Sequence, residues 1–246
     1  MDKAILERVR ELREQGHSPK QIARALGMAP SAVTPLIRAV AEQALADAPE
    51  AEPAGCWINV GWSEGLGVPA GAPGWADDLP EGEHTGGMVS VLVARKHGWN
   101  KLSVCGYLVD VYCLGVKNTL EPKIMSEIEL RRFLPTYYTV YRYGWHEAPL
   151  DLVRHLVFGA VDYARGLGFE PVAGFAKTAG HLGAWNGESA ITFGKDGKPF
   201  YFAGPSDNAN RVVRTLERTV GSPPAFDFVI PMQGTSFSMV GPGYVE

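Results

Sequence analysis

The sequence predicts an α+β protein with a three-helix N-terminal domain, a linker, and a larger α+β domain whose sheet is mostly antiparallel. Apolar residues recur at helical spacing before residue 46, and residues 45–87 are rich in Ala, Pro and Gly. From Met88 onward, strand-like runs and hairpins are interleaved with helical patterns, which favours α+β over a doubly wound parallel sheet. We therefore predict domains at residues 1–48 and 88–246, joined by a linker at residues 49–87.

The composition is that of a folded protein in a reducing compartment. Hydrophobic residues make up 46% of the 246 residues and charged residues 20%, unlike a disordered chain. The three cysteines have no C-x-x-C spacing, so neither a disulfide framework nor a Cys-rich zinc module is expected. The start, MDKAILERVREL, is a charged amphipathic pattern rather than a signal peptide, and no apolar run reaches the roughly 18 residues of a membrane span. We therefore expect a cytoplasmic protein with no membrane partner.

The first domain is predicted as three helices. In the first helix the apolar residues recur at helical spacing: Ile5, Val9 and Leu12. Ser18 and Pro19 then begin a second helix, with Ser as N-cap and Pro at the first helical position. Gly27 permits a tight turn into a third helix over residues 30–46. Pro35 leaves open whether that helix begins at Pro30 or at Thr34-Pro35.

The segment QIARALGMAPSAVTPLIR, residues 21–38, has the residue spacing of two closely crossing helices. A small residue, a turn glycine and two aliphatic residues stand at the positions that such a crossing needs: Ala23, Gly27, Val33 and Leu36. Over residues 3–44 the chain resembles the helix-turn-helix of bacterial repressors, resolvase-type recombinases and the promoter-reading region of sigma factors. The resemblance implies DNA as a partner, with the third helix in the major groove. The residues expected to contact DNA are Lys20, Arg24, Ser31, Thr34 and Arg38.

The helix that would face the groove offers few residues suited to reading bases. By position, its groove-facing residues are Ala29, Pro30, Ser31, Thr34, Pro35 and Arg38. Specific readout usually relies on Arg, Lys, Asn or Gln, and Arg38 lies late in the helix, where phosphate contact is expected. Residues 16–41 hold three basic residues and no acid, although the whole chain has a net charge of −4. We therefore expect DNA binding of low sequence specificity, with protein binding by the same unit as the alternative.

The predicted linker contains an apolar island. AEPAG and GVPAGAPG have the composition of a linker, but CWINVGW at residues 56–62 carries two tryptophans and two aliphatic residues. We expect this island to dock onto the following domain while its flanks remain mobile.

The segment GYLVDVYCLGVKN, residues 106–118, is predicted as part of a long strand with a bulge or break near Gly106. Both of its faces are apolar, which is typical of a central strand covered on both sides. Asp110 would then be a carboxylate in a dry setting, where it needs a hydrogen bond or a charged partner. We expect it to be buried and bonded to a donor from another element. Its candidate partners are Lys117, Asn118, His155 and Asp162.

A helix predicted at residues 151–167 places His155, Gly159 and Asp162 on one face. A His and a carboxylate two turns apart could serve a metal or a proton relay, whereas Gly159 indicates close packing. The candidate catalytic residues are Asp110, Lys117, His155 and Asp162, each with a purely structural role as the alternative. The common nucleotide-binding, hydrolase and metalloprotease motifs are missing, so the sequence indicates no particular cofactor or metal.

Three functions agree with these patterns. The first is a DNA-associated regulator whose C-terminal domain senses, dimerises or recruits. The second is an enzyme, such as a metal-dependent nuclease or other phosphodiester hydrolase, that uses acids near Asp110. The third is a protein-interaction module without nucleic acid. Because one helix-turn-helix with three main cations neutralises only about three phosphates, a DNA-binding chain is expected to form homo-oligomers through residues 88–246.

Overall fold

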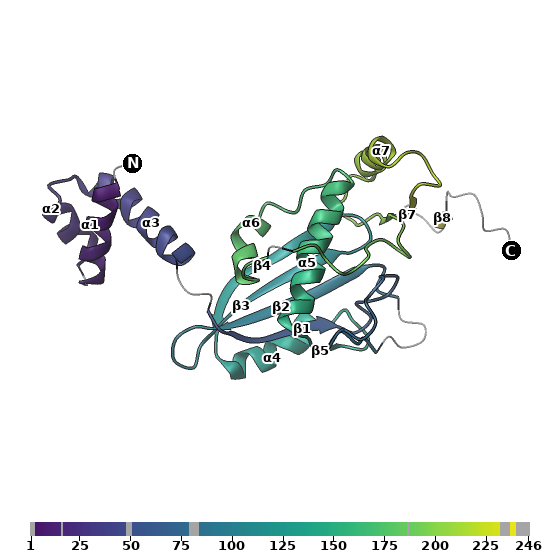
Figure 1. Ribbon diagram of the computed structural model, residues 1–246, viewed down its shortest axis with the longest axis horizontal. Coiled ribbons are helices and arrows are strands. Elements are labelled where there is room, and N and C mark those ends of the chain that lie inside the picture. The colour runs from purple at the N-terminus through teal and green to yellow at the C-terminus, as the bar shows by residue number, and fades with distance from the viewer. Residues whose placement is uncertain are drawn as a thin grey trace. The chain divides into compact units, whose positions relative to one another are not determined.

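The structure is a computed structural model that describes residues 3–15, 17–47, 51–78, 84–185, 187–231 and 237–239. These residues form helices and a five-stranded antiparallel sheet, which confirms the predicted α+β class. The chain divides into two compact units, Met1–Ala51 and Glu52–Glu246, and each is described by itself (Figure 1). No helix within the described residues is long and apolar enough to span a membrane.

The first unit consists of α1 (Lys3–Glu14), α2 (Pro19–Ala25) and α3 (Pro30–Asp47). Ser18 caps α2 in a reciprocal capping box with Gln21, and Gly27 at φ +62° turns the chain toward α3. The third helix therefore begins at Pro30 and contains Pro35. The three helices pack on a common core: Val9, Leu12, Ile22, Ala23, Val33, Leu36 and Val40.

The second unit is built on an antiparallel sheet in the order β4-β3-β2-β1-β5. Its strands are β1 (Pro53–Asn59), β2 (Met88–Lys96), β3 (Leu102–Asp110), β4 (Gly115–Met125) and β5 (Trp145–Glu147). A smaller sheet pairs β6 (Phe200–Phe202) with β7 (Asp227–Pro231) in parallel and β7 with β8 (Phe237–Met239) in antiparallel.

The structure corrects the predicted linker at residues 49–87. Within it, β1 is hydrogen-bonded on both sides, to β2 and to β5, and therefore lies inside the sheet. Cys56 and Ile58 are buried in the core, and the later tryptophans Trp62 and Trp75 are buried as well. The composition did not predict this strand, because its Ala, Pro and Gly residues stand at the ends of the strand and in the following turns, outside its buried middle. The second unit thus begins at Glu52 instead of Met88.

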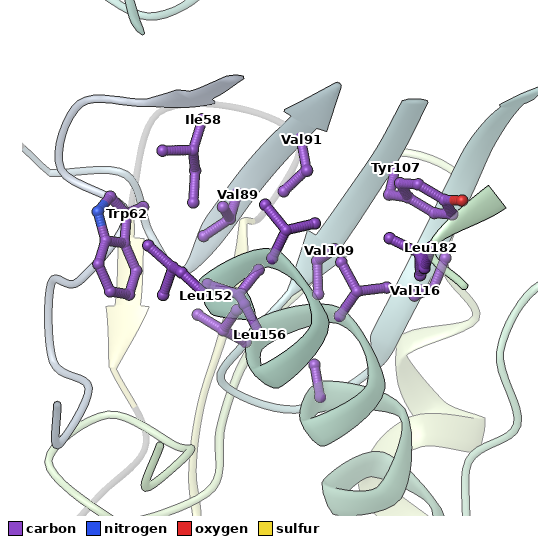
Figure 2. Packing of buried hydrophobic residues seen from close by; sticks show 14 of the residues in the cluster. Ile58, Trp62, Val89, Val91, Tyr107, Val109, Val116, Leu152, Leu156 and Leu182 are labelled. Atoms are coloured by element: carbon purple, nitrogen blue, oxygen red, sulfur yellow. The ribbon is translucent and has the colours of Figure 1, made fainter. Parts of the chain in front are cut away.

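Helices cover both faces of the main sheet. On one face, α5 (Leu150–Gly166) packs against the strands, and Figure 2 shows its Leu152 and Leu156 beside Val89 and Val109. On the other face, Leu92 and other sheet residues pack against α4 (Glu127–Tyr137). This two-sided burial explains why the strands read as apolar on both faces.

The bulge predicted near Gly106 is present, because the register of β3 against β4 shifts between Val104 and Gly106. The long strand also breaks at residues 111–114, where no break was predicted, and it resumes at Gly115 with φ +66°. A Cβ at Gly115 would lie 2.9 Å from the carbonyl oxygen of Ala160, so the turn depends on glycine. The residues that follow α4 form turns, and the Tyr138 hydroxyl there donates a hydrogen bond to the Trp57 carbonyl.

The remaining helices follow α5. They are α6 (Phe175–Thr178), a short 3₁₀ turn (Ala179–His181) and α7 (Ala209–Thr219). Around Asp196-Gly197 the chain forms an isolated bridge between Lys195 and Lys198, and β6 pairs with β7. Asn208 caps α7 by accepting a hydrogen bond from the backbone N–H of Arg211.

Candidate functional site

Asp110 ends β3, and its carboxylate is bound by the turn that follows. The residue is 5% exposed, and its Oδ1 accepts hydrogen bonds from the backbone N–H groups of Tyr112 and Cys113, both at 3.0 Å. Burial raises the pKa of Asp110 to about 6, although the positive charge of Lys117 and the backbone amides act in the opposite direction. The predicted burial is therefore confirmed. The predicted donor from another element is wrong, because the chain turns at residues 111–114 and supplies its own amides.

Lys117, near the start of β4, links Asp110 to a second carboxylate. Its Nζ lies 2.8 Å from Oδ2 of Asp207, and the two side chains are only 20% and 14% exposed. Oδ2 of Asp207 also accepts from the backbone N–H of Gly204 at 2.9 Å and from the Tyr201 hydroxyl at 3.5 Å. Burial acts to raise the pKa of Asp207, but these donors together with Lys117 lower it below its ordinary value. One ammonium thus serves two carboxylates, by direct contact with Asp207 and through space with Asp110.

His155 is held between two tryptophan rings, and its Nε2 lies 3.9 Å from Oδ1 of Asp151. The ring centroid of His155 lies 4.8 Å from those of Trp75 and of Trp185, both in edge-on geometry. Its Nδ1 accepts from the backbone N–H of Ala190 at 2.9 Å, which places the proton of a neutral ring on Nε2. His155 therefore fixes the loop that passes over α5.

The surroundings of Asp162 differ from those of His155. Its side chain is 62% exposed and faces Arg165 at 3.5 Å. Gly159, between the two on α5, is packed against Ser189 and Phe193, where a Cβ would come within 2.6 Å of both. The shared helical face thus serves packing, and the structure does not join His155 and Asp162 into a metal or proton-relay site.

Of the four candidate catalytic residues, only Asp110 and Lys117 are brought together. The sequence analysis missed Asp207 and Tyr201 as partners of this pair, because Asp207 is 90 residues from Lys117 and stands in a loop without a recurring pattern. Within the residues that the structure describes, no three His, Cys, Asp or Glu side chains gather where they could hold a metal ion.

The structure describes the side chains of four of the five residues that were predicted to contact DNA. Lys20 and Arg24 lie one turn apart on α2, and Ser31 and Thr34 lie in the first turns of α3; all four are exposed. The Thr34 hydroxyl donates to the carbonyl of Pro30 at 3.1 Å, which leaves its oxygen as an acceptor. The side chain of Arg38 lies outside the described ones.

The basic residues of α1 and α2 differ in their ion pairing. On α1, Arg8 pairs with Glu11, and Arg10 lies 3.8 Å from Glu7. Among the side chains that the structure describes, Lys20 and Arg24 have no carboxylate within ion-pair distance.

No family model, curated protein or solved structure matches this chain.

Proposed function

We propose that this chain is a DNA-associated protein, a regulator in which the first unit contacts duplex DNA as a helix-turn-helix. The observation that carries the proposal is the cationic face of α2, formed by Lys20 and Arg24, which pairs with no described carboxylate and lies next to the exposed start of α3. Cations of this kind bind phosphates and release condensed counterions from DNA. Ser31 and Thr34 add hydroxyl groups that can bond to phosphate oxygens.

The chemistry of this surface favours low sequence specificity. Beside its hydroxyls, the exposed start of α3 presents Ala29, Pro30 and Pro35, none of which donates a side-chain hydrogen bond to a base edge. With Lys20, Arg24 and Arg38 as the main cations, one copy neutralises about three phosphates. We further propose that the second unit supplies affinity by homodimerisation within residues 88–246, since two tethered sites bind more tightly than one.

The test is duplex binding by the full-length protein, measured by fluorescence anisotropy with arbitrary sequences between about 50 and 200 mM salt. We expect weak binding to every sequence and a logarithmic salt slope near −3 for each copy bound. The double variant Lys20→Gln/Arg24→Gln should reduce that slope by about 2 and weaken all duplexes equally. Light scattering on the same samples should show the dimer.

The matched control is Arg8→Gln/Arg10→Gln, which removes the same charge from α1, where acids already compensate it. Equal losses in both double variants would mean that net charge alone attracts DNA, and the assignment to α2 would then fail. An absence of salt-sensitive binding at low salt would instead favour the protein-interaction module. No observation favours the nuclease alternative, because the described residues around Asp110 offer no metal ligand set.

A further inference from the structure

A cleft of about 940 Å³ runs along α7 in the second unit. Its walls are the exposed face of α7, the start of β4 and the segment that follows α5. The volume lies in the range of small-molecule sites, about 300–1,000 Å³. Of the residues predicted as catalytic or DNA-binding, only Lys117 lines this cleft, and the site is independent of DNA binding by the first unit.

Three arginines form one wall of the cleft. Arg211, Arg214 and Arg218 stand at i, i+3 and i+7 of α7 and therefore share a face that spans about 10 Å. The opposite face of the helix is buried through Val212 and Leu216, so the arginines cannot rotate away from the cleft without loss of the core.

No described carboxylate pairs with the charge on this wall. All three arginines are exposed, and none has a carboxylate within ion-pair distance among the described side chains. The acid that lines the cleft, Glu170, is 3.1 Å from Arg165. Like charges at these helical spacings repel one another, so an anion in the cleft would relieve the repulsion.

The other wall differs in chemistry. Phe169 and Val172 line it with apolar surface, and Val172 is 38% exposed. Lys117 is also present, but its contact with Asp207 already balances its charge. The cleft therefore offers multiple guanidinium groups on one side and an apolar surface for a flat ring on the other.

We propose that this cleft binds a nucleotide that carries two or more phosphates. The phosphates lie along Arg211, Arg214 and Arg218, whose planar guanidinium groups form paired hydrogen bonds with phosphate oxygens. The base lies against Phe169 and Val172. A free inorganic polyphosphate contacts only the arginines of the cleft, and a nucleoside contacts only its apolar wall.

The test is isothermal titration calorimetry of the full-length protein with ATP, inorganic pyrophosphate and adenosine. We expect ATP to bind most tightly, pyrophosphate more weakly, and adenosine not measurably. Arg211→Gln/Arg214→Gln should weaken ATP binding by at least about tenfold, since charge-assisted bonds to phosphate are lost. Val172→Ala should weaken ATP but leave pyrophosphate unchanged.

The matched control is Arg131→Gln/Arg132→Gln, two exposed arginines on α4 away from the cleft lining, which should leave ATP binding unchanged. Equal losses in the two arginine pairs would overturn the site. ATP and pyrophosphate binding with the same affinity, or a single-stranded oligonucleotide binding where ATP does not, would overturn the nucleotide assignment. The α2 variant Lys20→Gln/Arg24→Gln should retain ATP binding, which separates this proposal from that of DNA binding.

Discussion

Asp110 and Asp207 both feel the charge of one ammonium group, yet their pKa values shift in opposite directions. Asp207 touches Lys117 at 2.8 Å, and its pKa is lowered. Asp110 feels the same charge only through space, and burial raises its pKa to about 6 despite its bonds to backbone amides. The difference teaches that the charge of a cation does not offset deep burial for Asp110, whereas direct contact with Lys117 and two further donors lower the pKa of the partly exposed Asp207.

The largest expected effect comes from removing the shared ammonium. Lys117→Met leaves Asp207 without its ion-pair partner and Asp110 without its nearest positive charge. Breaking a buried pair costs about 3–5 kcal/mol, and the residual exposure of this pair places the loss near the lower limit, about 3 kcal/mol at pH 7. Denaturant unfolding of the wild type and the variant measures this loss of unfolding free energy.

The matched control for that variant is Lys177→Met. Lys177 pairs with Glu121 at 3.5 Å, but both side chains are mostly exposed, at 75% and 67%. An exposed pair contributes only about 0–1 kcal/mol. A loss in Lys117→Met no greater than in this control would show that the two buried carboxylates do not depend on the ammonium.

A smaller effect is expected in the pH dependence of Asp110→Asn. The folded-state pKa of Asp110, about 6, lies above its ordinary value of 3.8, so the folded protein binds the proton more tightly. That contribution is complete below about pH 4 and is lost as the pH rises through 6. Between pH 4 and 7 the wild type should therefore lose about 2 kcal/mol of unfolding free energy relative to the variant.

Asp207→Asn sharpens this comparison because its sign is opposite. The lowered pKa of Asp207 contributes stability that is present above the ordinary value and is lost as the pH falls through the folded-state value. As the pH rises in acid solution, the unfolding free energy of the wild type should therefore increase relative to Asp207→Asn and decrease relative to Asp110→Asn. Parallel pH profiles for the two variants would contradict the assigned directions.

The sequence predicted those parts of this arrangement that depend on local pattern. The apolar alternation around Asp110 indicated a covered strand and a buried carboxylate, and both are present. The turn at residues 111–114 was missed because its residues, VYCL, are apolar and mostly buried, so no polar or Pro-rich segment marks it. Asp207 was missed because folding brings it to Lys117 across 90 residues, a separation at which periodicity carries no information.

The cleft on α7 shows the same division between local and long-range information. Arg211, Arg214 and Arg218 are visible as a helical stripe in the sequence, but a stripe of charge is usually only a solvated face. Phe169 and Val172, which complete the cleft, come from the segment after α5. Only the fold places them opposite the arginines.

The smallest expected effect is on stability, in Arg214→Gln. Lys117 stabilises two buried acids, whereas Arg214 has like-charged neighbours at Arg211 (i−3) and Arg218 (i+4). Removing two repulsive pairs should leave the free energy of unfolding unchanged or raise it by a few tenths of a kcal/mol in buffer without multivalent anions. Added pyrophosphate should then stabilise the wild type more than the variant, because it binds the folded wild type more tightly. A loss above about 1 kcal/mol without anions would exceed the usual effect of a surface substitution and would make Arg214 a structural residue instead.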